Sequence, residues 1–417
     1  MKILTINTSD IRGGAAITAS RLLKGLERYH GVENHLLVGL KYSSDPRITW
    51  TRNSTAQHYF EFGLDILTNA IGLQYQFFPF SSRTIMRKAV EIHPDLIYLR
   101  NLHGGYFPLP LLPKLSKIAP LVWTLSDMWS FTGNCAHAFD DDSWKYMRGC
   151  RDHDVYPAIG INTGRWLLRK KMKIYKRSDI HLICPSKWLY KLANQSPVFA
   201  GKEIVQIYNG FDIEVFRPRG QTACKKLLEI PENAKVIMFC ADSLTNNAWK
   251  GGTELLSALD RINAAAKETV HLLLVGAGNI WELERFGNLV AHHIGSLQSD
   301  TLMAACYSAS DLFIYPTRAD NLPNVLIEAI ACGTPCITFD VGGCAEIIKN
   351  GITGWVIDPG NSYDLAEKTI HTLNGPALIK EMSYAARADA EKRFSLQRMC
   401  ADYHDYFTKV AEGNRQQ

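Results

Sequence analysis

The chain has 417 residues, of which 46% are hydrophobic and 21% are charged, and its formal net charge is +5. This length allows two domains with cores of their own, and the composition is that of an ordinary globular protein. The weak positive charge does not imply a nucleic-acid partner, and none is expected. No apolar run reaches the ~20 residues that span a bilayer.

The N-terminal segment, residues 1–7, has no apolar core or cleavage site of a signal peptide, and it predicts a first strand instead. A cytoplasmic protein is therefore expected. Its ten cysteines are scattered along the chain, so reduced thiols are the default expectation.

Strand-like and helix-like segments alternate along the chain, which predicts α/β layers with parallel sheets. In the first half the expected elements are strands Lys2–Asn7, His35–Val38, Leu96–Leu99, Leu121–Leu125 and Ile180–Pro185 and a helix Ala15–Arg28. The pattern then restarts with strands Lys235–Cys240, His271–Gly276, Leu312–Tyr315 and Cys336–Asp340 and a helix Thr253–Ile262. Residues 384–409 predict one amphipathic helix.

Two similar α/β halves joined within residues 195–230 are the simplest account. The expected domains are residues 1–198 and 199–385, followed by a C-terminal helix within 386–417. Each half has a glycine turn, Gly13-Gly14 and Gly276-Ala277-Gly278, where a phosphate or sugar could approach the backbone. A plain tight turn is the alternative for both, because neither turn has the three-glycine dinucleotide fingerprint.

The segment Arg318–Glu328 follows a short apolar run and precedes Gly333, which predicts strand, loop and helix. Asn321 is the expected cap, Pro323 suits the first helical turn, and Gly333 suits the exit. The N-terminus of such a helix can hold an anion. Asp320 and Glu328 would flank that anion, roughly 12 Å apart if all eight steps between them were helical.

Several motifs in order resemble the retaining GT-B glycosyltransferases of family 4, and among them the bacterial enzymes that build surface polysaccharides of the colanic acid type. The resemblance covers nearly the whole chain. It is carried by the segments Gly13–Ala16, Trp123–Gly133, Tyr208–Asp212, Phe216–Pro218, Trp249–Gly252, Asp320–Pro335, Val341–Ile348 and Gly351–Val356.

This resemblance implies an α/β protein of GT-B fold, with two Rossmann-like domains facing each other across a cleft and a last helix that crosses back to the first domain. The first domain would bind the acceptor and the second the nucleotide-sugar donor. The implied reaction is transfer of a hexosyl group with retention of anomeric configuration, without a metal or other cofactor.

In the second domain the resemblance implies that Glu328 binds the ribose hydroxyls and that Asp320 lies near the donor sugar. Asp320 is one methylene shorter than the Glu that is commoner there. Backbone N–H groups of Asn321, Leu322 and Asn324 would contact the phosphates, as would the turn Gly13-Gly14 of the first domain.

Lys250 matches the cation that neutralises the departing diphosphate, where charge builds in the transition state. Relatives often carry an Arg shortly before it. This chain has no Arg in 241–247, so Lys250 acts alone or is helped by Asn246 or Asn247.

In the first domain Asp127 is the best candidate, because it follows an expected strand at the edge where α/β proteins bind ligands. Ser126 stands where relatives often have His, which weakens a general-base role for this segment. His103 and His137 are further candidates, each weighed equally against a structural role.

Asp140-Asp141-Asp142 is interpreted as a solvated charged turn rather than a metal site. Cys135 and Cys150 bracket it, with His137, Asp152 and His153 nearby. Two cysteines fall short of a closed four-ligand zinc site, so an incomplete metal site is the lesser hypothesis.

The stretch Arg165–Arg177 alternates basic and apolar residues and predicts an amphipathic helix with a cationic face. Two interpretations stay open. The helix packs its apolar side and exposes its charges to solvent, or it docks the protein on the inner face of an anionic membrane, where lipid-linked acceptors lie.

The leading hypothesis is a glycosyltransferase that moves a sugar to a saccharide or lipid-linked saccharide in bacterial surface polysaccharide synthesis. Two alternatives share the scaffold, because fold alone does not define function. One is a sugar-nucleotide epimerase, and the other is a sugar-nucleotide-binding protein without catalysis.

Overall fold

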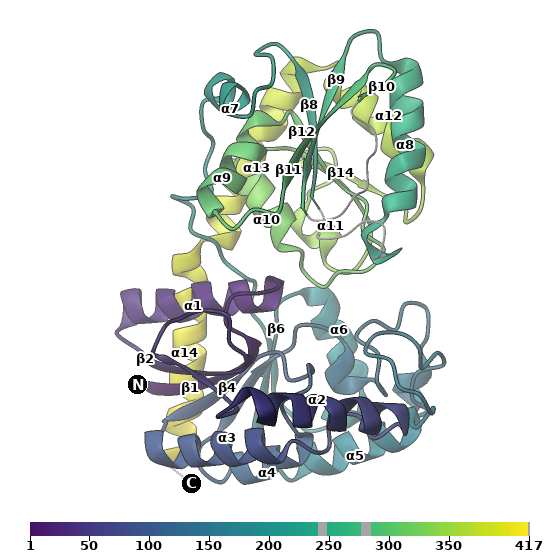
Figure 1. The fold of residues 1–417 in the computed structure, drawn as a ribbon. Coiled ribbons are helices and arrows are strands. Elements are labelled where there is room, and N and C mark those ends of the chain that lie inside the picture. The colour runs from purple at the N-terminus through teal and green to yellow at the C-terminus, as the bar shows by residue number, and fades with distance from the viewer. Residues whose placement is uncertain (241–247, 277–284, 416–417) are drawn as a thin grey trace. The chain divides into compact units, whose positions relative to one another are not determined.

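The computed structural model describes residues 1–240, 248–276 and 285–415 (Figure 1). The chain forms two compact units, Met1–Asn209 with Gln397–Gln417 and Gly210–Leu396. The units therefore change after Asn209 and after Leu396, whereas the sequence prediction placed the limits after residues 198 and 385. None of the helices in the described part of the chain is long and apolar enough to cross a membrane.

The first unit is built on a parallel sheet with the strand order β3-β2-β1-β4-β5-β6-β7. Its strands are β1 (Lys2–Ser9), β2 (Glu33–Leu40), β3 (Ile48–Trp50), β4 (Leu96–Leu99), β5 (Leu121–Thr124), β6 (Ile180–Cys184) and β7 (Ile204–Gln206). Its helices are α1 (Gly14–His30), α2 (Thr55–Ala70), α3 (Pro79–Ile92), α4 (Leu112–Leu115), α5 (Gly164–Lys176), α6 (Lys187–Gln195) and α14 (Leu396–Arg415).

The second unit repeats this plan with the order β10-β11-β9-β8-β12-β13-β14, parallel except for the β10–β11 pair. Its strands are β8 (Lys235–Cys240), β9 (Val270–Val275), β10 (Arg285–Phe286), β11 (Leu289–Gly295), β12 (Leu312–Tyr315), β13 (Cys336–Phe339) and β14 (Gly354–Ile357). Its helices are α7 (Gln221–Leu227), α8 (Gly252–Ala265), α9 (Asp300–Ala309), α10 (Asn324–Ala331), α11 (Cys344–Ile347), α12 (Ser362–Leu373) and α13 (Pro376–Phe394).

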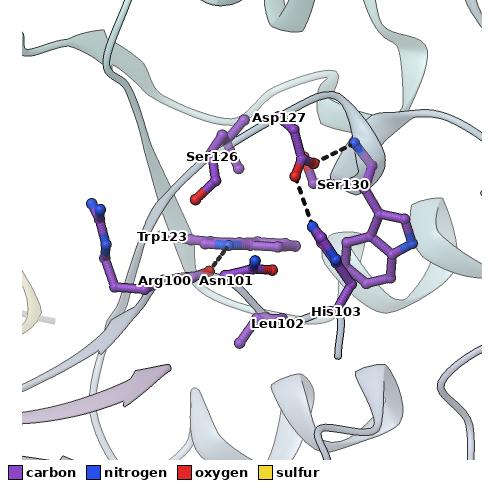
Figure 2. Close-up of a pocket in the computed structure, with 10 residues that line it drawn as sticks. Arg100, Asn101, Leu102, His103, Trp123, Ser126, Asp127 and Ser130 are labelled. Carbon is purple, nitrogen blue, oxygen red and sulfur yellow. Dashed lines mark hydrogen bonds and ion pairs between the residues drawn. The ribbon is translucent and has the colours of Figure 1, made fainter. Parts of the chain in front are cut away.

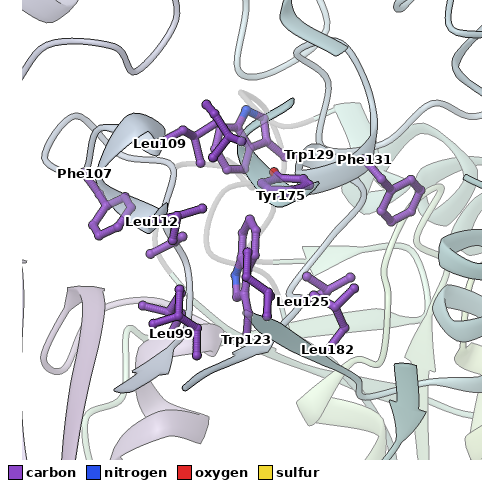
Figure 3. Packing of buried hydrophobic residues seen from close by; sticks show 14 of the residues in the cluster. Leu99, Phe107, Leu109, Leu112, Trp123, Leu125, Trp129, Phe131, Tyr175 and Leu182 are labelled. Atoms are coloured by element: carbon purple, nitrogen blue, oxygen red, sulfur yellow. The ribbon is translucent and has the colours of Figure 1, made fainter. Parts of the chain in front are cut away.

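The central strands are apolar along their length because helices cover both faces of a parallel sheet. Every residue of β4, β5, β12 and β13 is buried. In the first unit the core continues past the strand ends into a group of aromatic rings (Figure 3). The Trp123 ring lies 5.8 Å from that of Tyr175 and 6.5 Å from that of Trp129. This packing holds the loop after β5, which carries Asp127.

The C-terminal segment forms two helices, so the prediction of one helix over residues 384–409 is wrong. Ser395 is extended, with φ −68° and ψ 144°, and it pairs with Phe211 in an isolated bridge. Beyond this break, α14 packs on α1 of the first unit, where the rings of His30 and His404 stack at 4.3 Å. The return of the last helix to the first domain is therefore confirmed.

A buried ion pair anchors α2. Arg52 Nε donates to Glu61 Oε2 at 2.8 Å, and both side chains are at most 1% exposed. Glu61 also accepts from the N–H groups of Phe80 and Ser81 in the first turn of α3, at 2.8 and 2.9 Å. The Glu61 carboxylate thus connects α2 to Arg52, which follows β3, and to the start of α3.

Replacing Glu61 with Ala should destabilise the first unit by about 3–5 kcal/mol, because it leaves a buried guanidinium without its counter-charge. Urea unfolding followed by fluorescence measures the change. The matched control is Glu91→Ala, which removes an exposed carboxylate paired with Lys88 and should change the midpoint little. Equal shifts for the two variants would contradict this account.

Candidate active site

In the second unit the loop after β12 leads into α10, as the sequence predicted, but the details at the helix start differ. Pro323 occupies the cap position with φ −67° and ψ 119°, and the helix begins at Asn324. The expectation of Asn321 as cap and Pro323 in the first turn is therefore wrong. Gly333 follows the helix with φ 73°, which confirms the predicted exit.

Lys250, Tyr315 and Asp320 meet at the C-terminal end of β12. Lys250 Nζ lies 3.0 Å from Tyr315 Oη and 3.5 Å from Asp320 Oδ2, and Tyr315 Oη donates to Asp320 Oδ2 at 2.7 Å. Burial and the neighbouring Asp320 charge raise the pKa of Tyr315 well above its usual value, so it remains a donor. Lys250 and Asp320 are each about one-quarter exposed, which leaves both charges accessible to a ligand.

Backbone contacts place Lys250 at this strand end. The Trp249 carbonyl accepts from Arg318 N at 2.7 Å and from Thr317 Oγ1 at 3.0 Å. Gly251 has φ 72°, and a Cβ added there would lie 1.7 Å from the Pro316 carbonyl oxygen. Only glycine allows this close approach of the two chain segments.

Glu328 lies inside α10 and is 7% exposed. Tyr307 Oη, from α9, donates to Glu328 Oε2 at 3.3 Å. Burial and the Glu328 charge raise the pKa of Tyr307 well above its usual value, so this donor also stays protonated. Asp320 lies in the loop before the helix, so the eight positions between the two carboxylates are not all helical.

The structure describes some, but not all, of the other residues that the sequence predicts to contact a donor. Asn321 and Leu322 are buried in the loop, and Asn324 is the first residue of α10. Gly13 precedes α1 with φ 86°, and Gly14 opens that helix. Asn246 and Asn247, like Ala277-Gly278, lie outside the described residues.

The first unit contains a small pocket at the C-terminal ends of β4 and β5 (Figure 2). The pocket is small compared with typical small-molecule sites, so it suits one part of a substrate. Its lining residues are Arg100, Asn101, Leu102, His103, Trp123, Leu125, Ser126, Asp127, Trp129 and Ser130.

Asp127 and His103 form the polar centre of this pocket. His103 Nε2 lies 2.7 Å from Asp127 Oδ2, and Trp129 N donates to Asp127 Oδ1 at 2.9 Å. Burial acts to raise the pKa of Asp127, but the charges of His103 and His137 and these hydrogen bonds outweigh it and lower the pKa. Asp127 is therefore ionised at neutral pH. The structure thus brings His103 against Asp127, and His137 within range of its charge.

Sequence reasoning missed the part that Lys171 plays in this loop. It was assigned to the cationic face of the helix, but it is 1% exposed. Its Nζ donates to the carbonyls of Trp129, Thr132 and Gly133, and it lies 4.2 Å from the centre of the Trp129 ring. Burial lowers its pKa to about 7. Lys171 therefore fixes the turn whose N–H group orients Asp127.

Arg100 was also missed by the sequence analysis. It is 3% exposed and lines the same pocket as Asp127, with its side chain at the left of Figure 2. Its Nη1 donates to Tyr98 Oη at 3.0 Å. The only sequence signal for the buried guanidinium of Arg100 is its position directly after β4.

Cys135 and Cys150 form a disulfide, so the expectation of reduced thiols is wrong for this pair. As a disulfide they offer no thiolate to a metal, which removes them from the incomplete metal site considered above. Asp141 is buried rather than solvated, and accepts from Ser143 N and Arg151 N at 2.9 and 2.6 Å. It shapes the turn, while its neighbours Asp140 and Asp142 are exposed.

Residues 234–375, which include Lys250, Asp320 and Glu328, match the family model of glycosyl transferases group 1. The part of the second unit that carries these three residues is therefore similar to the group 1 glycosyl transferases. The match agrees with the resemblance that the motifs of the second half show. It does not extend to the colanic acid type of enzyme.

Curated relatives align over part of the chain. N-acetyl-α-D-glucosaminyl L-malate synthase of Bacillus anthracis is 27% identical over 217 residues, 51% of this chain and 56% of the relative. Phosphatidyl-myo-inositol mannosyltransferase of Mycobacterium leprae is 28% identical over 198 residues, 46% of this chain and 50% of the relative. The chain thus spans about half the length of these relatives.

Solved structures show the fold over nearly the whole chain. Sucrose-phosphate synthase of Thermosynechococcus elongatus has a TM-score of 0.70 at 16% identity and covers 99% of both chains. Anabaena HepE in complex with UDP and glucose has a TM-score of 0.69 at 20% identity, covering 98% of this chain and 100% of that one. The two Rossmann-like sheets and the returning α14 are those of the GT-B fold.

Replacing Gly251 with Ala should destabilise the second unit by about 3 kcal/mol or more, because left-handed strain adds to a clash with the Pro316 carbonyl. It should also displace Lys250 from Tyr315 and Asp320. The matched control is Gly360→Ala, at φ 80° with no atom within 4 Å of the added Cβ, which should cost only about 1–2 kcal/mol. Thermal unfolding measures both, and equal losses would refute the close-contact argument.

Proposed function

We propose that the protein is a retaining glycosyltransferase that moves a hexosyl group from a nucleotide sugar to a hydroxyl group of a saccharide or lipid-linked saccharide. The observation that carries the proposal is the cluster of Lys250, Tyr315 and Asp320 within the segment that is similar to group 1 glycosyl transferases. It offers a cation for a diphosphate and a carboxylate for sugar hydroxyls. No metal or other cofactor is part of the proposal.

On the donor side Lys250 neutralises the leaving diphosphate, and Asp320 accepts from hydroxyl groups of the donor sugar. Glu328 accepts from the ribose hydroxyls, and a carboxylate that binds two hydroxyls is a strong acceptor. The backbone of Asn321, Leu322 and Asn324 and the turn at Gly13-Gly14 contribute N–H groups to the phosphates. A uridine nucleotide is the first donor to test, because the similar HepE structure contains UDP.

On the acceptor side Asp127 and His103 hold the reacting hydroxyl group. The lowered pKa makes Asp127 a weak base, so it orients the hydroxyl rather than removing its proton. The acceptor oxygen then attacks the anomeric carbon from the face that the diphosphate leaves. The C–O bond to the phosphate breaks, and the hydroxyl proton passes to the departing phosphate oxygen.

We propose that the acceptor is a glycan of bacterial surface polysaccharide synthesis, on the basis of the motif resemblance. The two relatives described above are named for malate and for phosphatidyl-myo-inositol, which are chemically different compounds. A cytoplasmic protein working at the inner face of the membrane would meet lipid-linked acceptors.

Addition of the matching nucleotide sugar should raise the melting temperature of the protein, and Glu328→Gln should remove most of this shift because the ribose loses its anionic acceptor. A thermal-shift series with UDP-, GDP- and ADP-sugars measures the effect. The matched control is Glu367→Gln, an exposed carboxylate on α12.

A shift that persists equally in Glu328→Gln would contradict the assigned donor site. Binding with turnover of the nucleotide sugar in the absence of any acceptor would instead indicate an epimerase. Binding without transfer to any acceptor in a panel of saccharides and lipid-linked saccharides would indicate a sugar-nucleotide-binding protein.

A further inference from the structure

Helix α2 has its apolar and polar residues on the opposite sides from those of an ordinary surface helix. Its fully buried members are polar, Glu61 and Thr68, and Asp65 is partly buried with its pKa raised by burial to about 6. An ordinary surface helix turns its apolar side to the core and its charges to water. In α2 the ion pair to Arg52 fixes the reversed orientation.

The outer side of α2 carries large apolar side chains and no charge. Its exposed large residues, with exposed fractions of 46–67%, are Tyr59, Phe60, Phe62, Ile66, Leu67 and Ile71, the last directly after the helix. They recur on successive turns and form one surface, which we term the α2 face. Contiguous apolar surface of this kind marks a site of interaction in a soluble protein.

Helix α5 supplies positive charge. Its exposed residues include Arg165, Arg169, Lys173 and Lys176, followed by Arg177. No acidic residue occurs between Asp154 and Asp179 in the sequence. We term these five basic residues the α5 cations. Trp166 and Met172 are exposed among them, at 41% and 36%.

The C-terminal end of α2 and the start of α5 meet within the first unit. Gly160 N donates to the Asn69 carbonyl at 2.9 Å, and Thr163 Oγ1 donates to the Gly72 carbonyl at 2.5 Å. The C-terminal end of α2 is thus fastened to the segment that opens α5. Ile161, 56% exposed, lies at this junction and continues the apolar surface.

We propose that the α2 face and the α5 cations together dock the protein on an anionic lipid membrane. Aromatic and aliphatic side chains of α2 enter the boundary between headgroups and acyl chains, and the α5 cations bind the anionic headgroups. The charge pattern selects this occupant, because the uncharged α2 face next to the α5 cations matches a surface that is apolar below and negative above. The proposal stands on this surface and does not depend on glycosyl transfer.

The test is co-sedimentation of the full-length protein with phosphatidylcholine vesicles, with and without phosphatidylglycerol. The wild-type chain should bind the anionic vesicles, and raising the salt concentration should weaken binding because charge attraction is screened. The triple variant Phe60→Ser, Ile66→Ser, Leu67→Ser should lower the partition coefficient at least tenfold. The variant Arg165→Gln, Arg169→Gln, Lys173→Gln should lose the preference for anionic over zwitterionic vesicles.

Matched controls come from the second unit, where Leu227→Ser changes an exposed leucine, 62% exposed, and Lys226→Gln changes an exposed lysine. Both should bind as the wild type does. Circular dichroism and thermal unfolding of the triple variant verify that its exposed substitutions leave the fold intact. Wild-type binding by the triple variant, or no vesicle binding by the wild type, would overturn the proposal. So would a wild-type dimer in analytical ultracentrifugation that the triple variant converts to a monomer without any vesicle binding.

Discussion

The close approach of Gly251 to the carbonyl of Pro316 is the constraint on which the proposed donor site depends. It brings a lysine from the segment after β8 to the end of β12, although 65 positions separate Lys250 from Tyr315. Tyr315 then holds both Lys250 and Asp320 by its hydroxyl group. The cluster keeps a positive and a negative charge close together and accessible, and this combination suits a ligand that carries both a diphosphate and sugar hydroxyls.

In the first unit, a buried lysine rather than a glycine holds the loop that carries the candidate residue Asp127. Lys171 binds three carbonyl groups of the turn after Asp127, and the Trp129 N–H in that turn orients the carboxylate. In both units, polar side chains lie where parallel strands end, which is where open α/β sheets bind ligands. The same unit also presents the α2 face, so one domain would hold the acceptor hydroxyl and contact the membrane that carries lipid-linked acceptors.

The sequence predicted the central strands well because a parallel sheet covered on both faces requires apolar runs, such as Leu312–Tyr315. It did not reveal α2, whose apolar residues face outward because the buried ion pair of Glu61 with Arg52 turns the polar side of the helix inward. The break at Ser395 was hidden because apolar spacing continues through it. In the sequence, Lys171 looks like the six other basic residues of its stretch. Its burial depends on the carbonyl groups of Trp129, Thr132 and Gly133, which lie about forty positions earlier in the chain. Motif resemblance placed Lys250, Asp320 and Glu328 in one domain, but their contacts arise from loop geometry.

The central claim is that Lys250 binds the diphosphate and is held in position by Asp320 until the donor arrives. Calorimetric titration of free UDP, which lacks the sugar, tests it with Lys250→Met and Asp320→Asn. The account predicts that Lys250→Met weakens UDP binding by about tenfold or more, because a charge-assisted contact is worth roughly 1.5–3 kcal/mol. It also predicts that Asp320→Asn binds UDP at least as tightly as the wild type, because a competing negative charge is gone. Equal weakening by both substitutions, or no effect of Lys250→Met at an affinity measurable in the wild type, would contradict it.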